Sequence, residues 1–327
     1  MGSSWYFDEA EISSDDPGHS SPDSLSFNGR LFNYPVGSMS NLAAKGIVYV
    51  ESDPEEDDDL DVPDSTCGDH GILVESDPQN TTFQIVNTRI HDENKHVIYC
   101  VMVLRQDLGI DRDKVMVERR YSDFATLYKT LRKDLSSLFK DIGVNFPGKV
   151  MGQKNNLNPE LIESRRMALQ DFLQIIFKHK EVRQQQAFKE FFYLPGLREA
   201  TDSLKAGEFE NCLELLLNSV HLQVKLCDKV RETVATFGAI VAVLEALGKL
   251  KDAERYAKAA LELNHDDYLS PYMIPLLDTM AKLGRKLDMN TKTIERQLSE
   301  VQRMNGVEVE DTFTLRELAV KRFEKVK

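Results

Sequence analysis

The sequence predicts an α+β protein in which a small antiparallel sheet with its helices is followed by an all-helical domain. Three observations carry this prediction. Strand-like runs of β-branched residues occupy residues 82–120, helical spacing of apolar residues follows from residue 122, and the first 78 residues are rich in Ser, Asp, Pro and Gly. A chain of 327 residues also has room for two folded domains, at about 150 residues per domain.

Charge divides the chain at the same places. The formal net charge is -13, but residues 1–78 carry 18 acidic and 2 basic side chains, a net charge of -16. Residues 79–196 have a net charge of +5 and residues 197–327 a net charge of -2. The middle segment is therefore the part of this acidic protein that suits an anionic partner.

Residues 1–78 are predicted to form a disordered acidic tail. The run ESDPEEDDDLDVPDS lies at its centre, and such a composition cannot bury enough apolar surface to offset the entropy lost on folding. Two aromatic islands, SSWYFDEAE and LFNYP, lie within the tail. They are either short motifs for protein partners or ordinary hydrophobic residues of a tail, and the sequence leaves both interpretations open.

The sheet is predicted from three strands. The stretch TFQIVNTRIHDENKHVIYCVMVLRQD contains two strands around a polar turn at 91–95, and KVMVERRY supplies the third, which makes a three-stranded meander. A helix is expected to begin at Ser122, a suitable N-cap residue. Its apolar stripe consists of Phe124, Leu127, Tyr128 and Leu131.

A loop rich in Gly, Pro and Asn is expected at about 142–158, followed by a long helix in ELIESRRMALQDFLQIIFKHK and a shorter one in QAFKEFFYL. Beyond Pro195 the pattern is helical throughout. Gly207 and Gly248 open two similar units 41 residues apart, and the second unit resembles the second helix of a tetratricopeptide unit, with small residues for close helix packing. So few and irregular units predict a compact helical bundle.

The junction of the third strand and the first helix carries two arginines in ERRYSDF. Successive side chains of a strand face opposite ways, so Arg119 shares a face with the apolar Val115 and Val117 while Arg120 lies on the other. Tyr121 and Ser122 follow at the helix N-terminus, where backbone N–H groups favour an anion. This combination suits a phosphate, although arginines at strand ends are also commonly solvated.

A further arginine lies in the apolar stripe of the long helix. Arg165 falls four residues before Leu169, on the face predicted to be buried, and a buried guanidinium needs an anion or another partner. It could instead pair with Glu163 or Asp171, or extend to solvent. Lys149 lies in the loop NFPGKV, where a lysine is usually solvated.

These motifs together, RRYSDF, FPGK and ESRRMALQDF in that order, resemble the PX domain of sorting nexins across residues 80–196. The resemblance implies that Arg120 binds the 3-phosphate of phosphatidylinositol 3-phosphate, Tyr121 stacks on the inositol ring and Ser122 adds a phosphate contact. It implies that Lys149 contacts the 1-phosphate and that Arg165 binds inositol hydroxyls. The loop departs from the family in having FPGK where a double proline is common.

The resemblance predicts the organisation and the function of the whole chain. Residues 1–78 are expected to be the tail, 79–196 the PX domain and 197–327 a helical, tetratricopeptide-like interaction domain, as in the sorting nexin 20/21 subgroup, with the acidic tail nearer to sorting nexin 21. The implied function is a peripheral membrane adaptor on early endosomes that recruits protein cargo. Val150 and Met151 are candidates for membrane insertion or an ordinary pair of loop hydrophobes.

Other classes of function find little support in the sequence. The alternative that stays open is a protein scaffold whose PX domain binds protein, or weakly binds other phosphoinositides such as phosphatidylinositol 4,5-bisphosphate. No nucleotide, hydrolase or metalloprotease motif predicts an enzyme, and neither metal nor nucleic acid is expected as a partner. The four cysteines lack paired spacing and the most apolar run, 237–248, is too short to span a bilayer, which predicts a cytoplasmic, peripheral protein.

Overall fold

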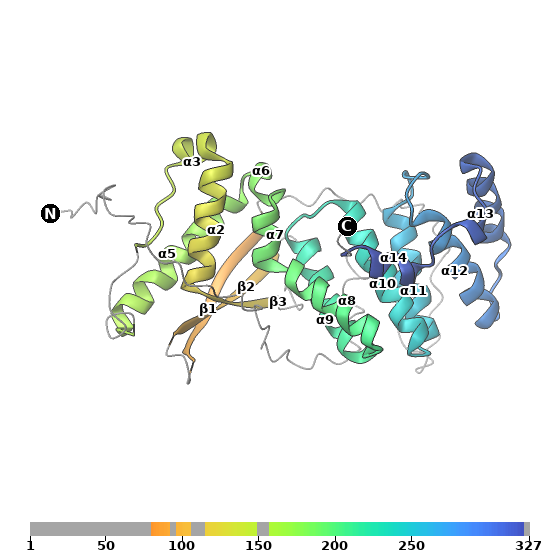
Figure 1. Cartoon of the computed structure of the whole chain (residues 1–327), viewed down its shortest axis with the longest axis horizontal. Coiled ribbons are helices and arrows are strands. Elements are labelled where there is room, and N and C mark those ends of the chain that lie inside the picture. Colours follow the sequence, from red (N-terminus) through yellow and green to blue (C-terminus); the bar gives the residue numbers. More distant parts are fainter. Residues whose placement is uncertain (1–79, 92–95, 106–114, 149–156, 324–327) are drawn as a thin grey trace, which may run out of the picture.

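The computed structural model describes residues 80–91, 96–105, 115–148 and 157–323 (Figure 1). The predicted acidic tail with its aromatic islands, and most of the predicted turn at 91–95, lie outside these described residues. In the part that is described, a sheet with its helices lies at one end of an elongated molecule and a stack of helices forms the other end.

The sheet is a three-stranded antiparallel meander, as predicted. Strands β1 (Thr81–Ile90), β2 (Val97–Arg105) and β3 (Val115–Arg120) follow the order β1-β2-β3, with a bulge between Ile85 and Asn87. Alternate residues face the core because side chains of a strand alternate between its two faces. The buried set includes Phe83, Ile85, Val101, Val103, Val115 and Val117.

Five helices accompany the sheet in the described residues. Helix α2 buries the predicted stripe at Phe124, Leu127 and Leu131, while Tyr128 is half-buried against the same core. The long helix is capped by Asn158, whose side chain accepts a hydrogen bond from the backbone N–H of Glu160 at 2.8 Å. The helices are α2 (Tyr121–Asp134), α3 (Ser136–Ile142), α5 (Pro159–Phe177), α6 (Lys180–Arg183) and α7 (Gln186–Phe192).

The structure corrects the expected start of α2. Ser122 does not cap the helix, because the helix begins at Tyr121 and Arg120 occupies the N-cap position. The carboxylate of Asp123 accepts a hydrogen bond from the backbone N–H of Arg120 at 2.7 Å, which places the cap two residues before Ser122. Ser122 therefore lies within the first turn and is exposed.

The rest of the chain is helical. Gly207 and Gly248 adopt φ values of +80° and +71° at the ends of two helices, a conformation that glycine adopts without steric cost. Ala253, Ala257 and Ala260 are fully buried, so α11 packs closely with its neighbours. The elements are α8 (Leu194–Ala206), α9 (Phe209–Lys225), α10 (Val230–Ala246), α11 (Leu250–Leu263), α12 (Met273–Lys286), α13 (Lys292–Asn305), the 3-10 helix η4 (Val309–Asp311) and α14 (Leu315–Lys321).

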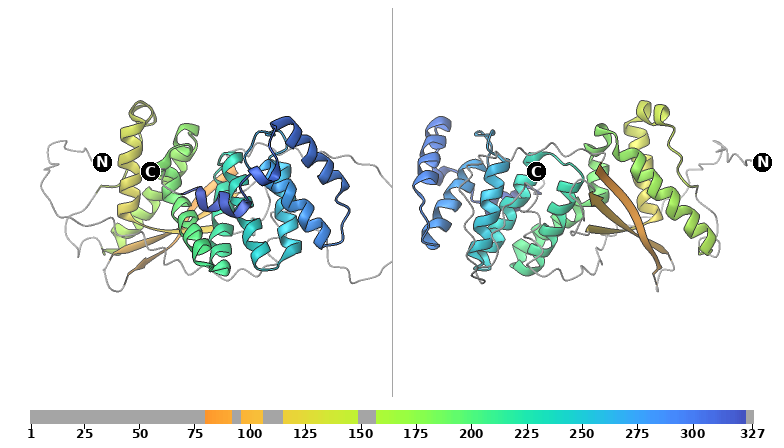
Figure 2. Two further views of the ribbon diagram at one scale, coloured as in Figure 1. Left: turned by 45° about the vertical axis from the view of Figure 1, so that its right-hand side comes forward. Right: turned by 180° about the vertical axis from the view of Figure 1, so that it is seen from behind.

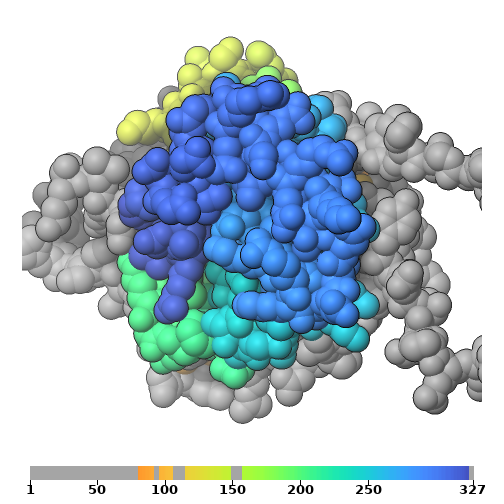
Figure 3. All heavy atoms as spheres, turned by 90° about the vertical axis from the view of Figure 1, so that its right-hand side faces the viewer, coloured from red at the N-terminus to blue at the C-terminus, as the bar shows by residue number. Residues whose placement is uncertain are grey.

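The helices form a compact stack at the far end of the molecule from the sheet. Both views of Figure 2 show helices α8 to α13 following one another away from the sheet. Viewed from that far end, α12 and α13 cover most of the surface (Figure 3). The short helix α14 returns to pack on α10 and α8. The tetratricopeptide-like character of this part stays a prediction.

The sheet and the helical stack share one hydrophobic core. Helix α9 packs on β2 and β3, and Lys225 at its end is buried, with Nζ donating to the carbonyl of Val103 at 3.3 Å. The Thr81 hydroxyl donates to the carbonyl of Lys225 at 2.9 Å. The predicted boundary between residues 196 and 197 falls inside α8, which begins at Leu194. None of the described helices has the length and apolarity needed to cross a bilayer.

Candidate phosphate-binding site at the start of α2

The two arginines at the end of β3 serve different purposes. Arg119 lies on the buried face with Val115 and Val117, whereas Arg120 is exposed on the opposite face. The guanidinium of Arg119 donates to the carbonyls of Phe191 at 2.6 Å and Phe192 at 3.3 Å. Burial lowers the pKa of Arg119 to about 10. Arg119 therefore ties the sheet to the end of α7, and Arg120 is the one available to a ligand.

Replacing Arg119 by Met is expected to lower the free energy of unfolding by about 3 kcal/mol, because charged hydrogen bonds of about 1.5–3 kcal/mol each are lost from buried carbonyls. Urea denaturation of the intact chain measures the loss. The matched control is Arg132→Met on the exposed face of α2, which should change stability by less than about 0.5 kcal/mol. Equal stability of the two variants would show that Arg119 has no structural role.

Tyr121 connects three separate segments. Its hydroxyl donates to the carbonyl of Pro147 at 2.6 Å, and its ring lies under the guanidinium of Arg165, with 4.3 Å between the guanidinium carbon and the ring centroid. Arg165 also donates to the carbonyl of Gly148 at 3.3 Å. Burial raises the pKa of Tyr121, and the charge of Arg165 opposes that rise. The β3–α2 junction, the loop and α5 therefore meet at this tyrosine.

The sequence left several possible partners for Arg165, and the structure distinguishes between them. Arg165 is 4% exposed, so it does not extend to solvent. Glu163 pairs instead with Arg166, at 2.7 Å, and Arg166 also donates to the carbonyl of Ile85 at 3.0 Å. Helical spacing points residues 165 and 166 about 100° apart, which is why one reaches the tyrosine and the other reaches β1.

Phe146 holds the loop in place and was not singled out in the sequence. Its ring stacks on Tyr128 at 4.6 Å between centroids with 9° between the planes, and it meets Phe172 edge-on at 5.1 Å. Pro147 and Gly148, which supply the two carbonyls of the site, follow it directly. Phe146 is the first residue of the FPGK motif, and that position was the signal that could have identified it.

Tyr121 and Arg165 are in contact, whereas Arg120 and Ser122 belong to the site through their adjacency to Tyr121 in the chain. The hydroxyl of Ser122 lies 3.4 Å from Asp123. Lys149, Val150 and Met151 lie outside the described residues. The described part of the site thus offers an exposed guanidinium, a hydroxyl, a half-buried aromatic face and a buried second guanidinium.

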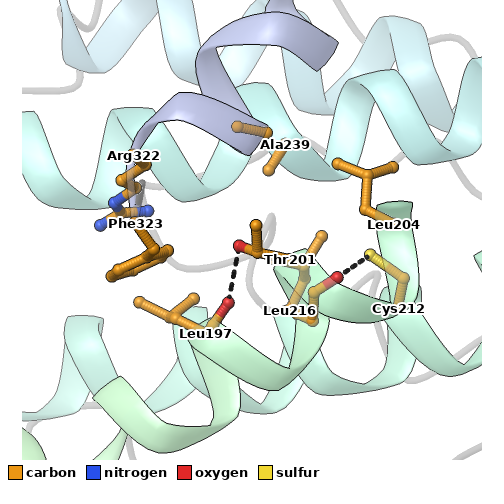
Figure 4. Close-up of a pocket in the computed structure, with 10 residues that line it drawn as sticks. Leu197, Thr201, Leu204, Cys212, Leu216, Ala239, Arg322 and Phe323 are labelled. Atoms are coloured by element: carbon orange, nitrogen blue, oxygen red, sulfur yellow. Dashed lines mark hydrogen bonds between the residues drawn. The ribbon is translucent and has the colours of Figure 1, made fainter. Parts of the chain in front are cut away.

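A small pocket in the described part of the chain lies away from this site. Figure 4 shows it between α8, α9, α10 and α14, with apolar side chains such as Leu197, Leu204 and Leu216 around it. Its volume of about 10 Å³ holds one water molecule at most. Burial raises the pKa of the adjacent Cys212 thiol to about 12. This hollow is a packing feature, and within the described ranges no cluster of metal-ligating side chains occurs either.

Comparison with known proteins agrees with this arrangement. The family model of the PX domain matches residues 108–194. Sorting nexin-20 of Bos taurus is 33% identical over 250 residues, which are 74% of this chain and 75% of that protein. Sorting nexin-21 of Mus musculus is 28% identical over 251 residues, which are 75% of this chain and 67% of that protein. These identities place the chain in the 20/21 subgroup without favouring the member that its acidic tail suggested.

A solved structure described as a designed CISK-PX domain also matches, with 24% identity and a TM-score of 0.28; the match covers 34% of this chain and 96% of that one. Sorting nexins with a PX domain are non-enzymatic, peripheral membrane adaptors of trafficking, and PX domains bind phosphoinositides. The expectation that the chain is not an enzyme is confirmed on this ground. With these motifs, this sheet and these relatives, the chain belongs to the sorting nexin family of PX-domain proteins.

Proposed function

We propose that this chain is a peripheral membrane adaptor that reads phosphatidylinositol 3-phosphate on early endosomes and recruits protein partners through its helical domain and acidic tail. The headgroup is assigned to Arg120, Tyr121, Ser122, Lys149 and Arg165. One observation carries the proposal. The buried Arg165 stacks on Tyr121, and Tyr121 directly follows the exposed Arg120 in the chain. One guanidinium group thus lies on the ring of Tyr121, and a second belongs to the residue that directly precedes this tyrosine in the chain.

The electrostatics of this arrangement suit a phosphomonoester. Such a group carries a charge of about -1.5 to -2 near pH 7 and offers three acceptor oxygens. The planar guanidinium of Arg120 can donate two parallel hydrogen bonds to it, and the start of α2 adds backbone donors. The ring of Tyr121 and the guanidinium of Arg165 would meet the inositol ring and its hydroxyls.

Replacing Arg120 by Gln is expected to reduce binding to vesicles containing phosphatidylinositol 3-phosphate at least tenfold. The lost charged hydrogen bonds account for about 1.5–3 kcal/mol, and 1.4 kcal/mol corresponds to a factor of ten. Because Arg120 is exposed, stability should change by less than about 0.5 kcal/mol. Vesicle co-sedimentation of the full chain measures the affinity, and a thermal melt checks the fold.

The matched control is Arg132→Gln, which removes the same charge from an exposed position near the end of α2 and should change vesicle affinity less than twofold. Vesicles carrying phosphatidylserine alone, phosphatidylinositol 4-phosphate or phosphatidylinositol 4,5-bisphosphate complete the panel. Equal losses of vesicle affinity in the two variants would show that binding depends only on general surface charge. Stronger binding to the 4,5-bisphosphate would overturn the assignment of the 3-phosphate lipid.

A further inference from the structure

A pair of histidines lies at the turn end of the β1–β2 hairpin, next to the candidate site: His91 directly follows β1 and His96 directly precedes β2. The rings of His91 and His96 stack with 4.9 Å between centroids and 11° between planes, and the backbone N–H of His91 donates to the carbonyl of His96 at 2.8 Å. The hairpin thus ends in two parallel imidazoles, one from the end of each strand.

The register of the sheet places this pair beside Arg120. Ile98 of β2 pairs with Arg120 of β3, so His96, two residues earlier, lies next to the point where the chain enters α2. The charges that act on His96 come from three elements: Arg120 at the end of β3, Asp123 in the first turn of α2, and Arg89 with His91 on the β1 side. Arg89 is itself paired with Glu118, at 2.7 Å.

The surroundings of His96 disfavour its protonated form in the absence of a ligand. Its Nε2 atom is buried and makes no hydrogen bond within the described residues. Burial lowers the pKa of His96 below 6.5, and Arg120, His91 and Arg89 lower it further, while Asp123 acts in the opposite direction. Among the described residues, three cationic or potentially cationic groups therefore act against protonation of this imidazole, and the carboxylate of Asp123 opposes them.

We propose that His91 and His96 form a proton-dependent edge of the headgroup site, so that binding a phosphorylated headgroup beside Arg120 takes up a proton from solvent onto this pair. This inference rests on the proposed function. A dianionic phosphate next to Arg120 offsets the positive charge that opposes protonation, and its oxygens accept hydrogen bonds from an imidazolium. The stacked geometry favours one added proton for the pair, because two imidazolium rings at this distance repel each other.

The direction of the pH effect follows from linkage. If the headgroup raises the pKa of the pair, the affinity for the headgroup must rise as the pH falls from above the pKa of the bound state to below the pKa of the free state. A rise of one pKa unit on binding corresponds to about a tenfold gain in affinity once the pH is below both values. The phosphomonoester itself gains a proton near pH 6, which works against binding and has to be measured separately.

The test compares the full chain with a His91→Asn/His96→Asn variant on vesicles containing phosphatidylinositol 3-phosphate at pH 7.5 and pH 5.5. Both proteins should bind equally at pH 7.5. At pH 5.5 the unchanged chain should bind about five- to tenfold more tightly than the double variant, which reports the protonation of the lipid alone. His265→Asn, which removes an exposed imidazole from the α11–α12 connection, is the matched control and should behave like the unchanged chain.

A second arm replaces the vesicle by soluble inositol 1,3-bisphosphate in calorimetric titrations at the same two pH values. The pH-dependent difference should persist, because the proposal concerns the headgroup. A difference confined to vesicles would show that the histidines respond to the bilayer surface, and it would overturn the proposal. Circular dichroism at pH 5.5 checks the fold, since a lowered pKa of His96 makes acid slightly destabilising.

Direct measurement covers the case in which the double variant fails to fold. Proton NMR titration of the unchanged chain, with and without the soluble headgroup, should show the pKa of His96 rising on binding. An unchanged pKa would overturn the inference, as would equal pH dependence of the unchanged chain and the double variant. Failure of the unchanged chain to bind the 3-phosphate lipid at either pH would instead contradict the proposed function, so the two failures are distinguishable.

Discussion

Replacing Asp228 by Ala is expected to lower the free energy of unfolding by about 3–5 kcal/mol, because it leaves a nearly buried ammonium group without its counter-charge. The carboxylate of Asp228 is 3% exposed and forms an ion pair with Lys189 at 2.9 Å. It also accepts hydrogen bonds from the hydroxyl of Tyr193 at 2.6 Å and the amide of Gln223 at 3.1 Å. One carboxylate thus connects α7, the start of α8 and α9.

This network lies where α7 meets α8 and α9. Burial, and then the charge of Asp228, raise the pKa of Tyr193, so that its hydroxyl stays protonated and can donate. Because Lys189 lies in α7 and Gln223 in α9, loss of the carboxylate removes links between these two helices as well as stability.

Urea denaturation followed by circular dichroism measures the effect. Asp228→Asn, which still offers an oxygen to Tyr193 but has no charge, should give a smaller loss than Asp228→Ala. The matched control is Asp278→Ala, which breaks an exposed pair with Lys282 within α12 and should cost less than about 1 kcal/mol. Similar losses at positions 228 and 278 would contradict the importance of the buried network.

Replacing Phe146 by Ala is expected to reduce both stability and headgroup binding. Loss of the ring removes contacts to Tyr128, Phe172 and Tyr121, and a buried Phe→Ala change costs about 3–5 kcal/mol. The same ring anchors the loop whose carbonyls meet Tyr121 and Arg165. We therefore expect affinity for vesicles with phosphatidylinositol 3-phosphate to fall more than tenfold, because a displaced loop loses the positioned geometry of the site.

Phe139→Ala separates the two effects. Phe139 is as buried as Phe146, at 7% exposure, and packs against the same Tyr128, but it belongs to α3 and does not directly precede the Pro147 and Gly148 carbonyls of the site. Both variants should lose stability by similar amounts in thermal melts. Only Phe146→Ala should lose vesicle affinity at a temperature where both are folded; equal affinities would show that the loop is not positioned by this ring.

Much of the fold follows from local patterns. Alternation along Val115–Arg120 predicted that Arg119 shares a face with Val115 and Val117 while Arg120 lies on the other, because the side-chain period of two in a strand holds wherever one face meets a core. The stripe from Phe124 to Leu131 predicted the buried face of α2 for the equivalent reason in a helix. The cap of α2 was predicted two residues late, since Ser122 and the Arg120–Asp123 pair are both plausible caps and only their geometry distinguishes them.

The contacts within the candidate site could not be predicted from local patterns. The sequence placed Arg165 on the apolar face of its helix and left open whether it meets a ligand, pairs with Glu163 or Asp171, or extends to solvent. Its actual neighbour, the ring of Tyr121, lies 44 positions earlier in the chain and is brought to it by the crossing of α5 past the start of α2. Long-range contacts of this kind depend on how whole elements pack, which no short window of sequence encodes.

The sequence by itself determined the family of motifs, the division into an acidic tail, a basic middle segment and a helical end, and the periodicity of strands and helices. Only the tertiary structure decided that Lys225 reaches the sheet at Val103, that Asp228 joins α7 to α9, and that His96 lies beside Arg120. The physical reason is the same in each case. A side chain's charge and period are local properties, whereas its burial and partners are set by segments that approach it from elsewhere in the chain.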